Sequence, residues 1–187
     1  MRDCAREAWD YMAQAGDGQM CDAVIDRGTL LAIMQAAKKA DDSLLRDYAE
    51  TTVAVADIKI AVRSMKTGKN KDFMKRAMAE CNTLDIDRLA TAAVAGMEEI
   101  ERYLADTAYA GGAEALSESA SAFERWCDNR IIETIKPQKY NPFTVGPIVA
   151  YILARLNEIK TVRIILTCKL NQLPEEAIRE RVREMYV

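Results

Sequence analysis

Hydrophobic residues recur every three or four positions along most of the chain, and runs that alternate between hydrophobic and polar residues are scarce. This spacing places apolar side chains on one face of an α-helix, so the pattern predicts helices rather than strands. Residues 1–136 contain no proline and are rich in Ala, Leu, Met, Glu, Lys and Arg, which all favour helices. The sequence therefore predicts an all-α protein.

Turn-forming and capping residues divide this pattern into successive helices. Asp41 or Asp42 can cap the start of a long helix over about residues 43–66, and Gly68 lies just past its end. A second long helix is expected over about 144–168, and Pro174 suits the first turn of the last helix. The other predicted helices cover about residues 3–15, 19–25, 29–40, 70–80, 84–94, 97–107, 113–118 and 119–136.

The C-terminal part of the chain repeats a pattern that occurs 100 residues earlier. Residues 163–182, RIILTCKLNQLPEEAIRERV, align without a gap on residues 63–82, RSMKTGKNKDFMKRAMAECN. Upstream, the hydrophobic stripes of the two long helices align with an offset of 101. The aligned members are Leu44, Tyr48, Thr51, Val55 and Ile58 in one helix, and Val145, Val149, Ile152, Leu156 and Ile159 in the other.

Each repeat thus contains a helix, a long helix, a basic turn and a short amphipathic helix, and a repeated helical unit without a repeated catalytic group is typical of a scaffold. We expect two related helical modules that superpose, over residues 1–100 and 101–187. The change of offset puts one extra residue into the first long helix near residues 60–62. We expect a π-type bulge or a wide turn there.

Composition indicates a polar surface around an ample core and offers no recognisable catalytic centre. Half of the 187 residues are hydrophobic, and the net charge of −3 argues against a nucleic-acid binder. No apolar run approaches the roughly 20 residues that cross a bilayer. The chain has no histidine, and its five cysteines form no CxxC pair, so we expect free thiols, no metal site and no cofactor.

Catalytic motifs are missing from the sequence as well. KTGKNK, Lys66–Lys71, has one glycine and no preceding strand, which favours a polar helix end over a phosphate loop. A catalytic pair of carboxylates is left open, since the spacing of the 29 acidic residues singles out no two of them. We expect no enzymatic activity and no catalytic residue.

The segments that carry a family resemblance lie in both repeats. GPIVAYILARLNEIKTVRIILTCKLNQLPEEAIRERVREMYV, Gly146–Val187, resembles the C-terminal end of the C subunit of the A/V-type rotary ATPases, which is named the d subunit in the eukaryotic vacuolar enzyme. DAVIDRGTLLAIMQAAKKADDSLLRDY and DIKIAVRSMKTGKN resemble the preceding unit of the same family, as does FERWCDNRIIETI. The resemblance is collinear and covers most of the chain.

This resemblance implies a funnel-like helical protein of three related modules, of which the chain holds two and lacks the N-terminal one. Members of the family occupy the central stalk, between the rotating shaft and the membrane ring of proteolipid subunits. They couple the two in ATP-linked ion transport without catalysis of their own. The implied location is cytoplasmic, peripheral on the inner face of the membrane through the complex. The alternative is a stand-alone helical adaptor or regulator that shares the fold.

Two features depart from the family. The chain is short, which indicates either a fragment or a naturally short paralogue. Cys168 stands where the family often has a glycine before the lysine, so the turn at that point is expected to differ.

Two groups of residues are candidates for a structural or binding role. Arg163 falls within the hydrophobic stripe of the second long helix, so we expect it to be at least half buried and clamped by Asp128, or next by Glu124. Arg63 lies about 100° off its own stripe and is expected to be more exposed. The lysines of the basic turns are most simply solvated helix ends, and the sharper hypothesis is contact with an acidic loop of the shaft or the ring. They are Lys66, Lys69, Lys71 and Lys169.

Overall fold

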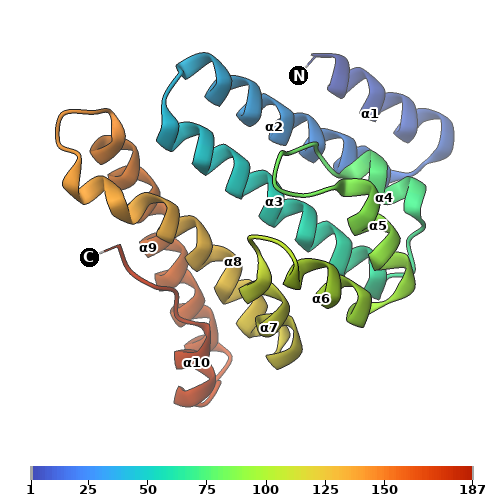
Figure 1. Ribbon diagram of the computed structural model, residues 1–187. Helices are drawn as coiled ribbons and strands as arrows, with labels where there is room; N and C mark the ends of the chain where they lie inside the picture. Colours follow the sequence, from blue (N-terminus) through green and yellow to red (C-terminus); the bar gives the residue numbers. More distant parts are fainter. Residues whose placement is uncertain (1, 187) are drawn as a thin grey trace. The chain divides into compact units, whose positions relative to one another are not determined.

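The computed structural model describes residues 2–186 and, within them, contains ten α-helices, one short 3₁₀ helix and no strand (Figure 1). The all-α prediction is therefore confirmed. No described helix combines the length and the apolar character that a membrane crossing requires. The helices are α1 (Arg2–Ala15), α2 (Gly18–Ala40), α3 (Ser43–Lys66), α4 (Lys71–Ala77), α5 (Ile86–Ala95), α6 (Met97–Ala105), α7 (Ala110–Glu118), α8 (Ala120–Ile135), η1 (Lys136–Tyr140), α9 (Gly146–Leu170) and α10 (Glu175–Arg181).

Short polar side chains start several of these helices by accepting a backbone N–H that the first turn leaves free. The Asp42 carboxylate accepts the amide proton of Leu45 at 3.1 Å at the start of α3, as the sequence predicts. Asp41 instead ends α2 in the left-handed conformation, with φ of 49°. Asn70 and Ser119 cap α4 and α8 in the same way as Asp42 caps α3.

One helix replaces the two that the sequence predicts over residues 19–25 and 29–40. α2 continues through Gly28, which is buried because α1 approaches α2 at this point. A β-carbon on Gly28 would lie 2.6 Å from the sulfur of Cys4. The glycine therefore serves close helix packing, and the expected helix boundary is wrong.

The predicted bulge near residues 60–62 is also wrong, because α3 is regular α-helix from Ser43 to Lys66. Ile58, Ala61 and Val62 are all buried. The buried face of α3 is therefore broad. The hydrophobic stripe shifts gradually around this face, and this shift accounts for the one-residue change of offset without a local distortion of the helix.

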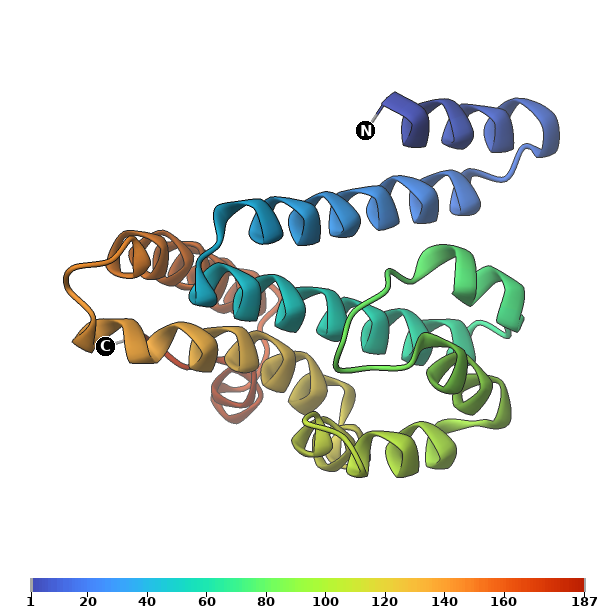
Figure 2. The same cartoon turned by 45° about the horizontal axis from the view of Figure 1, so that its top comes forward.

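The chain divides into two compact units, Met1–Ala110 and Gly111–Val187. The boundary follows Ala110 rather than residue 100, because α6 packs against α3 and α5 of the first unit. In this unit α1, α2 and α3 follow one another as neighbouring helices of alternating direction (Figures 1 and 2). α4 packs on α2 and α3, and α5 packs on α3 and α4. The largest fully buried apolar side chains of the unit are Val53, Ile58, Met74, Met78, Leu89, Ile100 and Leu104.

Two carboxylates of α3 hold the irregular segment between α4 and α5. Glu50 accepts the amide protons of Asn82 at 2.6 Å and of Thr83 at 2.7 Å, and it also accepts from both side chains. Seven residues further along α3, Asp57 accepts the amide proton of Ala79 at 3.0 Å. Because residues seven apart share one face of a helix, this face of α3 fixes the segment at both ends.

The second unit repeats the order of a helix, a long helix, a turn and a short helix. α9 packs on α8, α10 and η1, and α10 also packs on α8. This order matches α2, α3 and α4, while the superposition of the two repeats stays a prediction. The turns differ: Gly68 is left-handed after α3, whereas α9 runs through Cys168 to Leu170, and Gln172 takes the left-handed conformation.

Candidate functional site

Asp128 on α8 binds two basic side chains of the second unit. Lys160 Nζ on α9 donates to its Oδ1 at 2.6 Å, and Arg183 Nε donates to its Oδ2 at 2.7 Å. The Arg183 side chain is 7% exposed and that of Asp128 is 10% exposed. The expected clamp residue Asp128 is thus paired and nearly buried, but its close partners are Arg183 and Lys160.

Backbone groups of the segment after α10 form hydrogen bonds with side chains of α8 and α9. Asn157 on α9 donates its side-chain amide to the carbonyl of Glu184 at 2.8 Å, and the amide of Glu184 donates to Asn129 on α8 at 2.9 Å. Within α10 itself, the carbonyl of Glu180 accepts a hydrogen bond from Arg125 on α8 at 2.7 Å. The C-terminal segment therefore bridges α8 and α9 around the ion pair of Asp128 and Arg183.

Arg163 contradicts the expected clamp because its side chain is exposed and forms no hydrogen bond or ion pair with the other described residues. The cause is the rotation of α9. Its buried face consists of small and polar residues, namely Gly146, Ala150, Asn157, Thr161 and Cys168. The large hydrophobic residues that predicted a core stripe lie on the other side, and Arg163 lies among them.

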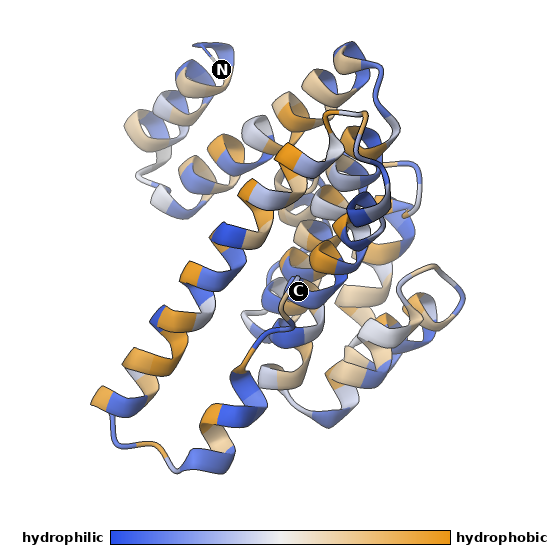
Figure 3. Cartoon of the chain, turned by 90° about the vertical axis from the view of Figure 1, so that its left-hand side faces the viewer, coloured by the Kyte–Doolittle hydropathy of each residue, from blue (hydrophilic) through white to orange (hydrophobic). Residues whose placement is uncertain are grey.

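We name this exposed side the outer face of α9. Its hydrophobic members are Val145, Ile148, Tyr151, Ile152, Leu156, Ile159, Val162, Leu166 and Leu170, all exposed. At 100° per residue they span about 140° of the helix, opposite the buried face. Figure 3 shows hydrophobic colour along the whole of α9, the long helix that leads to α10 and the C-terminal segment. The helix is thus hydrophobic on one side and packed on the other.

Replacing Arg163 with leucine is expected to change the free energy of unfolding by less than about 0.5 kcal/mol, because an exposed side chain without a partner contributes little. Chemical denaturation of the full chain measures this. Arg183→Leu is the matched comparison and should be clearly destabilising. If Arg163→Leu instead lowers the free energy of unfolding by more than about 2 kcal/mol, Arg163 does pair with a carboxylate, as the sequence predicts.

The four lysines of the basic turns have different surroundings. Lys71 Nζ donates to Asp87 at 3.0 Å and to Thr91 at 2.8 Å, so α5 holds it. Lys69 lies over the ring of Phe73, 5.1 Å from its centroid. Lys66 and Lys169 are exposed at the ends of their long helices. As expected, Arg63 is exposed.

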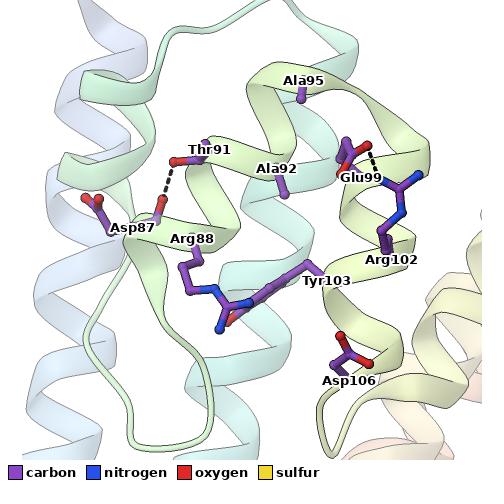
Figure 4. A pocket seen from close by; sticks show the side chains of 9 residues that line it. All are labelled: Asp87, Arg88, Thr91, Ala92, Ala95, Glu99, Arg102, Tyr103 and Asp106. Atoms are coloured by element: carbon purple, nitrogen blue, oxygen red, sulfur yellow. Dashed lines mark hydrogen bonds and ion pairs between the residues drawn. The ribbon is translucent and has the colours of Figure 1, made fainter.

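A cavity of about 370 Å³ lies between α5 and α6 (Figure 4). The guanidinium of Arg88 lies 5.3 Å from the ring centroid of Tyr103, and Glu99 pairs with Arg102. Lys75 and Lys71 bind Asp87 on its rim, and these hydrogen bonds lower the pKa of Asp87. Asp87 and Glu99, two of the acidic residues that line the cavity, are therefore each paired with a basic side chain. Among residues 2–186, no three acidic or cysteine side chains are placed to hold a metal ion.

Sequence reasoning missed Arg183 and the outer face of α9. Arg183 follows the last helix, outside any periodic pattern, and is 55 residues from Asp128, so no local signal pairs the two. The outer face did leave a signal. Val162, Ile164, Ile165 and Leu166 make α9 hydrophobic all round, which indicates two packing faces rather than one.

Comparisons with known proteins give one family. The model of the ATP synthase (C/AC39) subunit family matches residues 1–181. The C subunit of the A-type ATP synthase of Methanocaldococcus jannaschii is 27% identical over 156 residues, which are 79% of this chain and 39% of that protein. The chain thus spans about two fifths of the length of this curated relative. No solved structure matches the chain.

Proposed function

Because the chain belongs to the ATP synthase (C/AC39) subunit family, we propose that it is a non-catalytic central-stalk subunit of an A/V-type rotary ATPase. In this role it couples the rotating shaft to the membrane proteolipid ring during ATP-linked ion transport. It is attached peripherally to the cytoplasmic face of the membrane through these partners. The observation that carries the proposal is the family match over almost the whole chain.

The dimensions of the helices support a role as a rigid spacer. α3 and α9 have 24 and 25 residues, which correspond to lengths of about 36 and 37 Å at 1.5 Å per residue. Each is packed against neighbouring helices within its own unit. A protein that couples two parts of a machine needs such packed helices because transmitted force must not be absorbed by local bending.

The basic turns are the proposed contacts with the partner subunits. Lys66 and Lys169 are exposed at equivalent ends of α3 and α9, so both can reach acidic side chains of a partner. Lys69 belongs to the same contact in this proposal, with Phe73 beneath its amino group. Lys71 contributes less, since Asp87 and Thr91 already bind it.

Binding of the full chain to purified shaft subunits and to the detergent-solubilised proteolipid ring of an A-type ATPase tests the proposal. We expect retention on both components. The double variant Lys66→Glu, Lys169→Glu should weaken retention about tenfold, and added salt should weaken it too, because exposed charges are screened.

Lys39→Glu is the matched control, since Lys39 is an exposed lysine in the last turn of α2. It should bind like the unaltered chain. If the chain binds neither the shaft nor the ring, the coupling role is refuted, and a stand-alone adaptor remains. If both components bind but the lysine variant is unaffected, the coupling role stands and the basic contacts are wrong.

A further inference from the structure

The two long helices differ in how their equivalent hydrophobic faces are covered. Val55 on α3 is 4% exposed, whereas Leu156, its counterpart in the repeat on α9, is 57% exposed. The same contrast holds for Ile58 and Ile159. Both stripes are hydrophobic, so the difference lies in the neighbouring helices and not in the sequence of the long helix.

The first unit supplies two helices that the second unit does not. α5 and α6 pack on α3, in addition to α2 and α4. Within the described residues of the second unit, α9 is accompanied only by α8, α10 and η1. A helix that is hydrophobic all round is normally covered all round. The outer face of α9 therefore lacks the equivalent of the α5–α6 pair.

Charge indicates what kind of helix pair fits. Arg155, Arg163 and Lys169 lie on the outer face or at its edge, and the one acid nearby, Glu158, is paired with Arg155. Arg163 thus presents an uncompensated positive charge among hydrophobic residues, and covering it requires a carboxylate. Residues 85–106, which form α5 and α6, contain six acidic and two basic residues.

A second copy of α9 does not meet this requirement. Antiparallel pairing centred on Ile159 would bring Arg155 of one copy against Arg163 of the other. Parallel pairing would bring each arginine against itself. Like charges brought together in a desolvated contact are strongly unfavourable. The partner is therefore a different surface.

We propose that the outer face of α9 docks a helical hairpin of another protein chain, with the character of α5–α6: a hydrophobic stripe and a carboxylate that meets Arg163. The inference rests on the second unit and on the internal repeat. It is independent of the proposed coupling role, since a partner outside a rotary ATPase would satisfy it equally.

A synthetic peptide of residues 85–106 is the probe. In the full chain the peptide's equivalent site on α3 is already occupied by α5 and α6, so the outer face of α9 is the site left for it. Fluorescence anisotropy of the labelled peptide, titrated with the full chain, should give saturable binding. Replacing the three glutamates of α6, namely Glu98, Glu99 and Glu101, with glutamine in the peptide should weaken binding.

Variants of the full chain locate the contact. Leu156→Ser with Ile159→Ser should weaken peptide binding about tenfold or more, because two anchoring side chains are lost. Arg163→Gln should weaken it about fivefold and should abolish the difference between the acidic and the amide peptide. Val94→Ser is the control, since Val94 is a similarly exposed hydrophobic residue on α5. Circular dichroism checks that all variants fold, which we expect because the altered side chains are exposed.

Three results would overturn the proposal. The first is no saturable peptide binding, or binding that the outer-face variants leave unchanged. The second is dimerisation in sedimentation that Leu156→Ser and Ile159→Ser abolish, which would assign the face to a second copy. The third is binding to anionic phospholipid vesicles that depends on the same residues, which would assign it to a membrane surface.

Discussion

Replacing Asp128 with alanine is expected to lower the free energy of unfolding of the second unit by about 3–5 kcal/mol, the usual cost of leaving a buried charge without its partner. Arg183 is almost fully buried, and Asp128 is the carboxylate that binds its guanidinium. Lys160 loses the same partner but is half exposed and can turn to water. Most of the loss therefore comes from Arg183.

Denaturant unfolding of the full chain, with amide hydrogen exchange read separately for α8 and α9, measures the effect. Protection should fall in the second unit and stay unchanged in α2 and α3. Glu118→Ala, an exposed acid at the end of α7, is the control and should have an effect below about 0.5 kcal/mol.

A double variant separates the stranded charge from the lost contact. Asp128→Leu together with Arg183→Leu removes both charges, so it should destabilise the unit less than Asp128→Leu alone. If Asp128→Ala costs less than about 1 kcal/mol, Arg183 finds another partner and the ion pair does not hold the C-terminal segment.

The stability of the first unit is expected to depend on pH through Asp57. This side chain has no exposed surface, and within the described residues its Oδ2 has no hydrogen-bond partner. Burial raises the pKa of Asp57 from 3.8 to about 7, although the amide of Ala79 and the charge of Arg27 both lower it. The folded state therefore binds the proton more tightly than the unfolded state does.

It follows that the contribution of Asp57 is full below about pH 4 and is lost as the pH rises through about 7. At 1.36 kcal/mol per pKa unit, the loss is at most about 4 kcal/mol between pH 4 and pH 8. The difference between the unfolding free energies of the unaltered chain and of Asp57→Asn isolates this contribution. Asparagine keeps the acceptor for Ala79 and stays neutral at every pH.

The Asp57→Asn protein should resemble the unaltered chain near pH 4 and should be the more stable of the two near pH 8. Asp47→Asn, an exposed acid on the same helix, is the control and should leave the pH dependence unchanged. Two parallel stability curves for the unaltered chain and Asp57→Asn would show that Asp57 titrates normally in the folded protein.

Helix type and most helix ends could be predicted from the sequence, because capping is local. Asp42 needs only the three residues that follow it to start α3. The expected helix boundary at Gly28 is wrong because the role of this glycine depends on Cys4 of a different helix. Sequence alone does not reveal whether a glycine ends a helix or admits a neighbour.

The candidate site was harder to predict for a related reason. Periodicity identifies a hydrophobic face but not which of two faces the chain itself covers, and in α9 the small residues Ala150 and Cys168 face inward. Because these small residues face inward, Arg163 lies on the exposed side of α9 and not in the core. Asp128 lies on α8, beside α9, and is paired, but its buried donor is Arg183 and not the expected Arg163, and Arg183 follows no helical pattern.

Hydrogen bonds between α3 and residues 79–83 attach this irregular stretch firmly to the helix. Glu50 and Asp57 accept the amide protons of this stretch directly, so separating it from a folded α3 breaks three hydrogen bonds to backbone N–H groups. Local opening here is therefore coupled to opening of the core. The connection between α4 and α5 is thus attached to α3 by its own hydrogen bonds, in addition to the direct packing of α5 on α3.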